Sequence, residues 1–139
     1  MDREPLEGIA AADAHLRRAV PLPTVVLPLP RWVDVFALGP DAVEVAWNLD
    51  DTRSGPGRLA LYAGHAPAPP RAFDPPAEPV ALGRYAHRTM PLADADPSLK
   101  PVHELSWADD GLHLRLTGQG PWGLEDLVAV ADSVRAEHA

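Results

Sequence analysis

The chain has 139 residues, a length at which one globular domain can bury a single hydrophobic core. Its formal net charge is −8 at pH 7 and its few cations are scattered, which excludes the basic patch that nucleic acids and anionic membrane surfaces require. It contains no cysteine, so disulfides and thiolate metal sites are excluded, and no apolar run is long enough to span a membrane.

Amino-acid usage is strongly biased. Alanine, proline and arginine are abundant, whereas isoleucine, lysine and asparagine each occur once. This bias is typical of a bacterial genome rich in G and C, so the preference for arginine over lysine is not a sign of phosphate binding. The chain starts with acidic and polar residues, unlike a secretory signal. As written, the sequence predicts a cytoplasmic protein, or an extracytoplasmic one if it is a fragment of a membrane protein.

The first third of the chain predicts a helix over residues 3–19. Pro5 suits a first helical turn, where no backbone N–H is needed, and several apolar residues fall near one stripe. Prolines at positions 21, 23, 28 and 30 then leave room for at most a short edge strand around residues 24–27. Residues 31–38 alternate loosely and predict a further strand.

The middle of the chain predicts a hairpin and one more strand. Residues 42–49 alternate clearly, with the valines, Trp47 and Leu49 on one face, and residues 58–63 resume this pattern after a polar loop over 50–57. The proline-rich stretch 64–79 predicts an extended connector. Residues 80–92 predict one strand, followed by a loop over 93–101. Within that strand, one face carries Tyr85, His87 and Thr89.

Residues 102–117 predict a second hairpin. A two-residue turn at Asp110-Gly111 would pair Trp107 with Leu114, whereas a four-residue loop would pair Trp107 with Leu112. Both registers gather the apolar side chains on one face, so both stay open. On the other face, Glu104 and Arg115 are expected to form an exposed ion pair worth about 0–1 kcal/mol.

The last predicted element is a helix over residues 123–137, whose apolar residues follow helical spacing: Leu124, Leu127, Val128, Ala131 and Val134. Strands and helices are not interleaved, which favours an α+β fold over a parallel α/β sheet. We therefore expect residues 1–139 to form a single α+β domain. Its curved antiparallel sheet would have five or six strands, with an N-terminal helix and a C-terminal helix packed on it.

One motif resembles a dinucleotide fingerprint. The run from Gly118 to Gly123 spells G-x-G-x-x-G between a predicted strand and a predicted helix. However, no further strand follows in this sequence to complete a βαβ unit, and the preceding strand belongs to a hairpin. We therefore expect a flexible corner with Trp122 packed on the core, and no nucleotide cofactor.

The other candidate groups do not form a recognisable constellation. None of the six histidines has metal-ligand spacing, and His103 and His113 are expected on opposite sheet faces. The paired carboxylates at 50–51 and 109–110 lie in predicted turns, and no serine sits in a nucleophile elbow. Trp47 and Trp107 are expected to pack in the core instead of lining a ligand cavity. The sequence thus predicts no catalytic, cofactor-binding or metal-binding residue.

The C-terminal third resembles a known domain. It carries Glu104-Leu105-Ser106-Trp107, then a run from Asp109 to Leu116, then Gly123-Leu124-Glu125-Asp126-Leu127 continuing to Val134. This order is similar to the closing motif of a small domain at the extracytoplasmic end of bacterial anti-sigma factors and related envelope proteins. The resemblance implies a sensory or binding domain and carries over no catalytic residue. The given sequence departs from that family's pattern, because neither a transmembrane segment nor a zinc-binding anti-sigma module is found within it.

These observations predict a non-catalytic binding or regulatory module that resembles a sensory domain. The alternative is a small ligand-binding protein or an enzyme with its site between the sheet and the C-terminal helix; whether the chain is an enzyme stays open. The partner would be a protein or a small ligand, and a homo-oligomer is compatible with the sequence. A pocket with convergent polar groups would favour the alternative, whereas a flat apolar surface would favour a protein partner.

Overall fold

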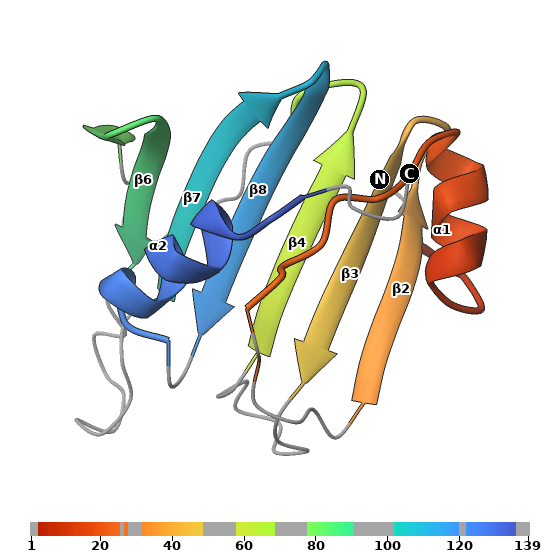
Figure 1. Ribbon diagram of the computed structural model, residues 1–139, viewed down its shortest axis with the longest axis horizontal. Helices are drawn as coiled ribbons and strands as arrows, with labels where there is room; N and C mark the ends of the chain where they lie inside the picture. The colour runs from red at the N-terminus through yellow and green to blue at the C-terminus, as the bar shows by residue number, and fades with distance from the viewer. Residues whose placement is uncertain are drawn as a thin grey trace.

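A computed structural model describes residues 3–25, 27, 32–48, 58–68, 78–90, 102–119 and 122–135. Over these ranges the chain forms an open antiparallel sheet of eight strands with two helices, α1 (Ile9–Leu16) and α2 (Leu124–Asp132) (Figure 1). The predicted α+β class is confirmed, but five or six strands was too few. Neither helix is long and apolar enough to cross a membrane.

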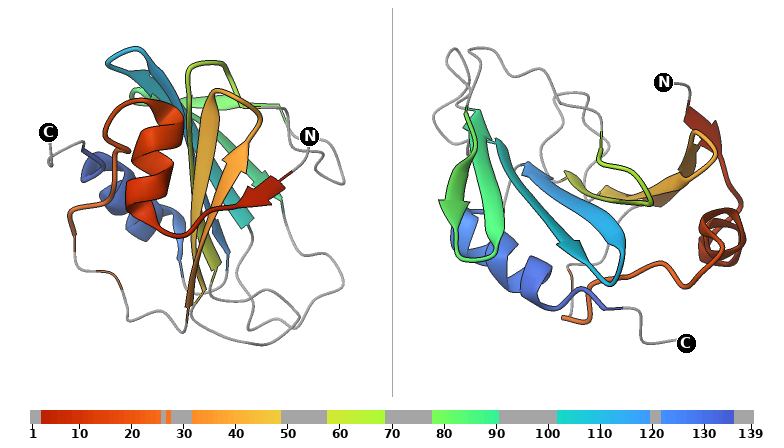
Figure 2. Two further views of the ribbon diagram at one scale, coloured as in Figure 1. Left: turned by 90° about the vertical axis from the view of Figure 1, so that its right-hand side faces the viewer. Right: turned by 90° about the horizontal axis from the view of Figure 1, so that it is seen from above.

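The sheet consists of two four-stranded halves that meet at its centre. In sheet order the strands are β1 (Arg3–Pro5), β2 (Trp32–Leu38), β3 (Ala42–Asn48), β4 (Arg58–Gly64), β8 (Leu112–Gln119), β7 (Val102–Asp109), β6 (Tyr85–Met90) and β5 (Val80–Leu82). β4 pairs with β8, which joins the two halves. Figure 2 shows the twist of the sheet, in which the strand direction changes from β6 to β2.

The beginning of the chain differs from the predicted helix over 3–19. Residues 3–5 form β1, whose backbone pairs with the outer edge of β2, and the Leu6 N–H continues this contact to the Val35 carbonyl at 2.8 Å. Gly8, at φ 127°, turns the chain into α1, and Arg17, at φ 65°, ends the helix in the left-handed conformation. The free edge of β2 offers the first residues backbone hydrogen bonds that apolar periodicity does not reveal.

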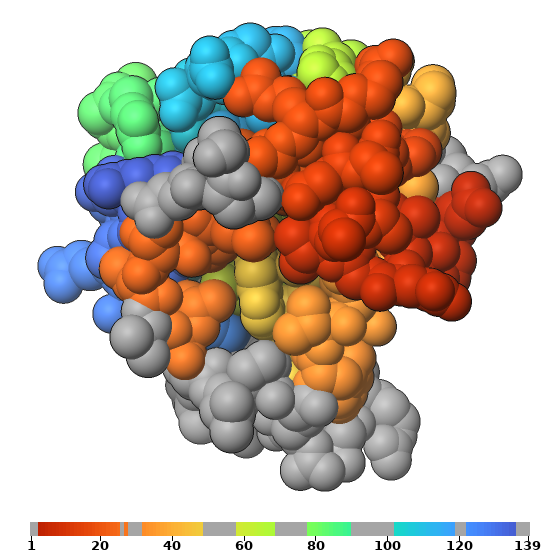
Figure 3. Space-filling view, turned by 45° about the vertical axis from the view of Figure 1, so that its right-hand side comes forward, coloured from red at the N-terminus to blue at the C-terminus, as the bar shows by residue number. Residues whose placement is uncertain are grey.

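The segment after α1 crosses the helix-covered face instead of forming the predicted edge strand at 24–27. Leu22 makes a single bridge with Arg135, with N···O distances of 3.0 and 2.9 Å, and Thr24 bonds to Ser133. Figure 3 shows α1 and this segment, in red and orange, covering the sheet beside α2. The backbone contact with Arg135 follows the end of α2 at Asp132, which is earlier than the predicted end at residue 137.

Between β5 and β6 the structure corrects the prediction of one strand over 80–92. Gly83, at φ 59°, and Arg84 form a tight turn, so that Leu82 pairs with Tyr85. The predicted strands over 31–38, 42–49 and 58–63 correspond to β2, β3 and β4. The predicted loops over 50–57 and 93–101, and residues 69–77 of the connector, lie outside the described residues.

The β7–β8 hairpin selects the two-residue turn. Trp107 pairs with Leu114, and Asp110 and Gly111 have φ angles of 50° and 80°, which is the left-handed geometry of a type I′ turn. The apolar residues of the hairpin lie in the main core together with side chains from α1, α2, β3 and β4. Its largest fully buried side chains are Leu16, Leu59, Leu61, Leu105, Leu112, Leu116 and Leu127.

Candidate functional site

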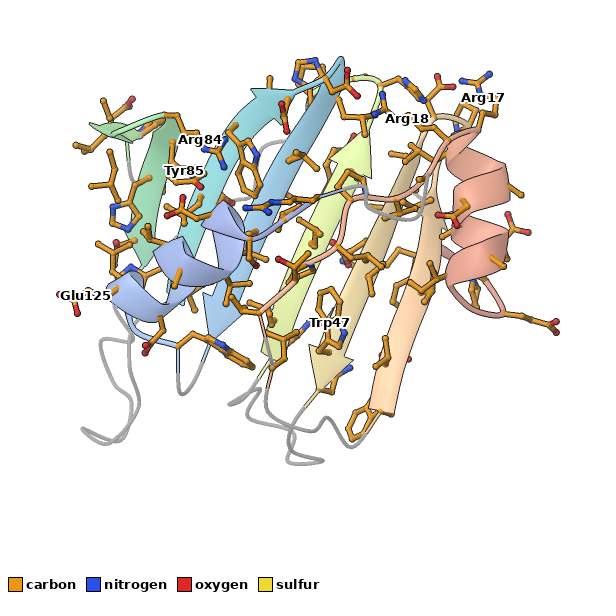
Figure 4. The ribbon with its side chains drawn as sticks, in the orientation of Figure 1. Arg17, Arg18, Trp47, Arg84, Tyr85 and Glu125 are labelled. Atoms are coloured by element: carbon orange, nitrogen blue, oxygen red, sulfur yellow. The ribbon has the colours of Figure 1, made fainter. Side chains whose placement is uncertain are left out.

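An open groove lies between α2 and the hairpin of β5 and β6. Its volume is about 550 Å³. It is lined by Leu82, Gly83, Arg84, Tyr85, Leu124, Glu125, Val128 and Asp132. In Figure 4, Arg84 and Tyr85 lie on one side of α2, and Glu125 lies near the start of the helix. We call this cavity the α2 groove.

The sequence builds the α2 groove from a tight turn and an amphipathic helix. Leu127, Val130 and Ala131 of α2 are buried against the sheet. The spacing of four residues places Leu124, Val128 and Asp132 on a neighbouring stripe, and all three line the groove. The turn between β5 and β6 supplies the opposite wall. The groove therefore has an apolar stripe along α2, with Glu125 near the start of the helix and Asp132 at its end as charged groups.

The polar end of the groove is a chain of three hydrogen-bonded side chains. The Tyr85 hydroxyl donates to Asp132 Oδ1 at 2.5 Å, and Arg84 Nη2 donates to the Tyr85 oxygen at 3.0 Å. The Arg84 guanidinium also lies 5.1 Å from the centre of the Tyr85 ring. The Tyr85 ring also contacts the core, where it packs edge-to-face with the Trp107 ring at a centroid distance of 5.1 Å. Tyr85 is thus held by contacts at its hydroxyl and at its ring.

The environment of Tyr85 keeps its hydroxyl protonated. Burial raises the pKa of Tyr85, and the hydrogen bond to the Asp132 carboxylate raises this pKa further, whereas the hydrogen bond from Arg84 lowers it. The net direction is upward from the ordinary value. The phenol therefore serves as a fixed hydrogen-bond donor to Asp132 at neutral pH.

This pKa shift predicts a loss of stability at alkaline pH. A group whose pKa is raised in the folded protein stabilises it fully below its unfolded pKa of about 10, and this contribution is lost as pH rises through the folded value. Tyr62 is the only other tyrosine, so the Tyr62→Phe variant isolates Tyr85. We expect ultraviolet titration of this variant to show tyrosinate forming above pH 10, and the double variant with Tyr85→Phe to lose less stability in that range. Tyrosinate formation below pH 10 would contradict this assignment.

Two histidines that the sequence analysis did not pair meet on β6 and β7. His87 Nε2 lies 3.1 Å from His103 Nδ1, and the rings stack with centroids 5.3 Å apart. Thr89 Oγ1 is 2.9 Å from His87 Nε2 and 3.1 Å from His103 Nδ1. Burial lowers the pKa of both rings, and the neighbouring His87 lowers that of His103 further. Alternation placed His87 and Thr89 on one face, but only the β6–β7 pairing brings His103 to them.

On the opposite face of the sheet, the prediction of an exposed ion pair between Glu104 and Arg115 is wrong. The Glu104 side chain is only 5% exposed, and its nearest partner is Arg88, whose Nε and Nη2 donate to the two carboxylate oxygens at 2.8 and 3.1 Å. Arg115 is farther away, at 4.0 Å. A smaller cavity of about 270 Å³ lies at this place, with Ser106 and His113 also in its wall. The sequence analysis missed Arg88 because this residue lies on a different hairpin.

A second buried carboxylate lies on the same face. Glu44 Oε1 is 3.1 Å from Arg3 Nη2 and 3.8 Å from Arg58 Nη2. Neither donor is aligned with this oxygen, which accepts no hydrogen bond from the described residues. Each half of the sheet thus holds one buried glutamate between arginines, which offset the cost of burying the negative charge.

The remaining sequence candidates lie apart. Asp110 is in the β7–β8 turn, where it binds Arg18 at 2.8 Å, and residues 50–51 lie outside the described part of the chain. Gly118 is inside β8, which is antiparallel to both its neighbours, so the strand before the G-x-G-x-x-G motif does not belong to a parallel βαβ unit. In the described ranges, no three residues among His, Asp and Glu form a group that could hold a metal ion.

No protein-family model, curated protein or solved structure matches the chain. The resemblance of residues 104–134 to the anti-sigma-factor domain therefore stays a prediction, and the functional argument depends on the geometry of the sites.

Proposed function

We propose that this chain is a non-catalytic binding module whose site is the α2 groove, and that its ligand is a small organic cation with an apolar body. The observation that carries this proposal is the groove itself, an apolar cavity with a fixed polar group at one end. Its volume of about 550 Å³ falls within the range of roughly 300–1,000 Å³ that is typical of small-molecule sites. A sensory domain of the kind that the resemblance implies would use such a cavity to detect its signal.

Charge in the α2 groove favours a cation. Glu125 and Asp132 contribute two carboxylates to its wall, and Arg84 contributes one guanidinium that already binds the Tyr85 hydroxyl. A carboxylate has several acceptor sites, so Asp132 can accept from a ligand ammonium as well as from Tyr85. The net charge of −8 on the chain also raises the local concentration of cations. Leu82, Leu124 and Val128 would contact the apolar part of the ligand.

The chemistry of the groove supports binding over catalysis. General acid–base catalysis is most effective when the pKa of the group lies near the working pH. The pKa of Tyr85 is shifted away from neutral pH, since it is raised from an already high ordinary value. The groups of the polar end therefore hold a ligand by hydrogen bonds and charge.

Two probes with the same apolar body test the proposal. Phenethylamine carries a cation and 3-phenylpropionate an anion, so calorimetric titrations with both compare the charge preference directly. We expect saturable binding of the amine and affinity for the anion lower by about tenfold or more, because exchanging the ammonium for a carboxylate replaces attraction to Glu125 and Asp132 by repulsion, and tenfold corresponds to roughly 1.4 kcal/mol.

Two matched variants locate the binding site. Asp132→Asn keeps an acceptor but removes the charge, and we expect it to weaken amine binding by about tenfold. Asp126→Asn removes the charge of an exposed carboxylate on α2 that does not line the groove, and it should bind as the original chain does. Equal affinity for both probes, or equal effects of the two variants, would contradict the proposal.

One observation favours a protein partner as the second candidate. β5 is the last strand of the sheet order, so its outer backbone edge has no partner strand among the described residues, and Val80 on it is 64% exposed. An extended peptide can add to such an edge through backbone hydrogen bonds. Failure of both small probes to bind would favour this edge over the α2 groove.

A further inference from the structure

His87, Thr89 and His103 place three ligand-type atoms at the corners of a triangle. The atoms are His87 Nε2, His103 Nδ1 and Thr89 Oγ1, and the sides of the triangle measure 3.1, 2.9 and 3.1 Å. The antiparallel pairing of β6 with β7 produces this arrangement, because Thr89 lies directly opposite His103 and His87 lies two residues away on the same face.

The triangle has the dimensions of one face of a metal coordination shell. Two nitrogens 3.1 Å apart subtend roughly 100° at an ion placed about 2.0–2.1 Å from each, the usual distance for imidazole ligands. This angle lies between the values of about 90° and 109° for adjacent ligands in octahedral and tetrahedral shells. We propose that His87 Nε2 and His103 Nδ1 bind one divalent transition-metal ion of the Zn²⁺ or Cu²⁺ type, with Thr89 Oγ1 and water in the remaining positions.

The surroundings of the histidine pair fit this assignment. Zinc and copper prefer imidazole ligands, and the ring must be neutral to bind. Burial lowers the pKa of both rings, which favours the neutral form. His87, Thr89 and His103 are each half-buried, so the triangle is partly shielded yet accessible to an ion and its water ligands.

The metal site is separate from the α2 groove. None of its three residues lines that cavity, although Tyr85 and His87 are both on β6. The inference therefore does not depend on the proposed amine ligand, and each can fail without the other. The sequence predicted no metal site because it places His103 and His113 on opposite faces of the sheet. The pair of His103 with His87 depends on the pairing of β6 with β7, which the sequence pattern does not reveal.

Metal titration of the purified, metal-free chain tests the site. We expect one equivalent of Zn²⁺ to bind by calorimetry and one equivalent of Cu²⁺ to give an electron paramagnetic resonance spectrum with couplings from two imidazole nitrogens. His87→Gln and His103→Gln should each weaken Zn²⁺ binding by about tenfold or more, because each removes one ligand. His113→Gln is the matched control, since His113 lies on the neighbouring strand β8 in the wall of the other cavity, and should bind Zn²⁺ unchanged.

Several results would overturn the inference. The first is that neither metal binds saturably in the millimolar range, in which case the two rings form only a hydrogen-bonded pair. The second is that both histidine variants give the same Zn²⁺ binding isotherm as the original chain. The third is a copper spectrum with couplings from fewer than two imidazole nitrogens. The copper spectrum needs no substitution, so it decides the question even if a variant does not fold. Circular dichroism of each variant identifies a folding defect.

Discussion

Replacing Trp107 with alanine is expected to lower the free energy of unfolding by about 3–5 kcal/mol. The side chain is 8% exposed and lies in the main core, where it pairs with Leu114 across the β7–β8 hairpin. Its ring also contacts the Tyr85 ring edge-on, which holds the wall of the α2 groove. Removing it would leave a cavity that the surrounding leucines and strands cannot fill.

Urea unfolding followed by circular dichroism measures this loss without relying on tryptophan fluorescence. Trp32→Ala is the matched control, because Trp32 is 42% exposed at the start of β2, where its indole N–H donates to Asp34 at 3.1 Å. We expect the control to lose less than about 1 kcal/mol. A loss below 1 kcal/mol for Trp107→Ala, or equal losses for both variants, would show that the assigned core face is wrong.

Arg88→Met is expected to lower the free energy of unfolding by about 3 kcal/mol. Removing one member of a buried ion pair typically costs about 3–5 kcal/mol because the other charge stays buried without compensation. Here Glu104, 5% exposed, would lose two hydrogen bonds of 2.8 and 3.1 Å, while Arg115 would stay 4.0 Å from its carboxylate. The remaining arginine places the expected loss at the lower end of that range.

Two further variants separate the buried charge from the packing of the arginine stem. Adding Glu104→Gln to Arg88→Met removes the buried charge, so the double variant should be more stable than the single one. Arg17→Met breaks an ion pair with Asp41 whose side chains are 66% and 48% exposed, and this change should cost less than about 1 kcal/mol. If the double variant were no more stable than Arg88→Met, the loss would come from packing.

Sequence periodicity predicted elements whose apolar faces are long and regular. The alternation predicted over residues 42–49, the hairpin around Asp110-Gly111 and the apolar stripe of the C-terminal helix correspond to β3, to β7 with β8, and to α2. Periodicity was misleading at the start of the chain, where it predicted one helix over residues that form β1 and α1. It also predicted one strand across Gly83, where the chain turns between β5 and β6. Short edge strands carry few residues, so they give no periodic signal, and backbone pairing decides them.

The sequence by itself determined the α+β class, the core faces of the central strands and the separation of His103 from His113, because each depends on the alternation of side chains along a single strand or hairpin. Only the tertiary structure decided which strands are neighbours. The pairing of β6 with β7 brings Arg88 to Glu104 and His87 to His103, and the packing of α2 beside the β5–β6 turn creates the α2 groove. Both candidate sites therefore join residues far apart in sequence, since local periodicity specifies the face of a strand but not the strand beside it.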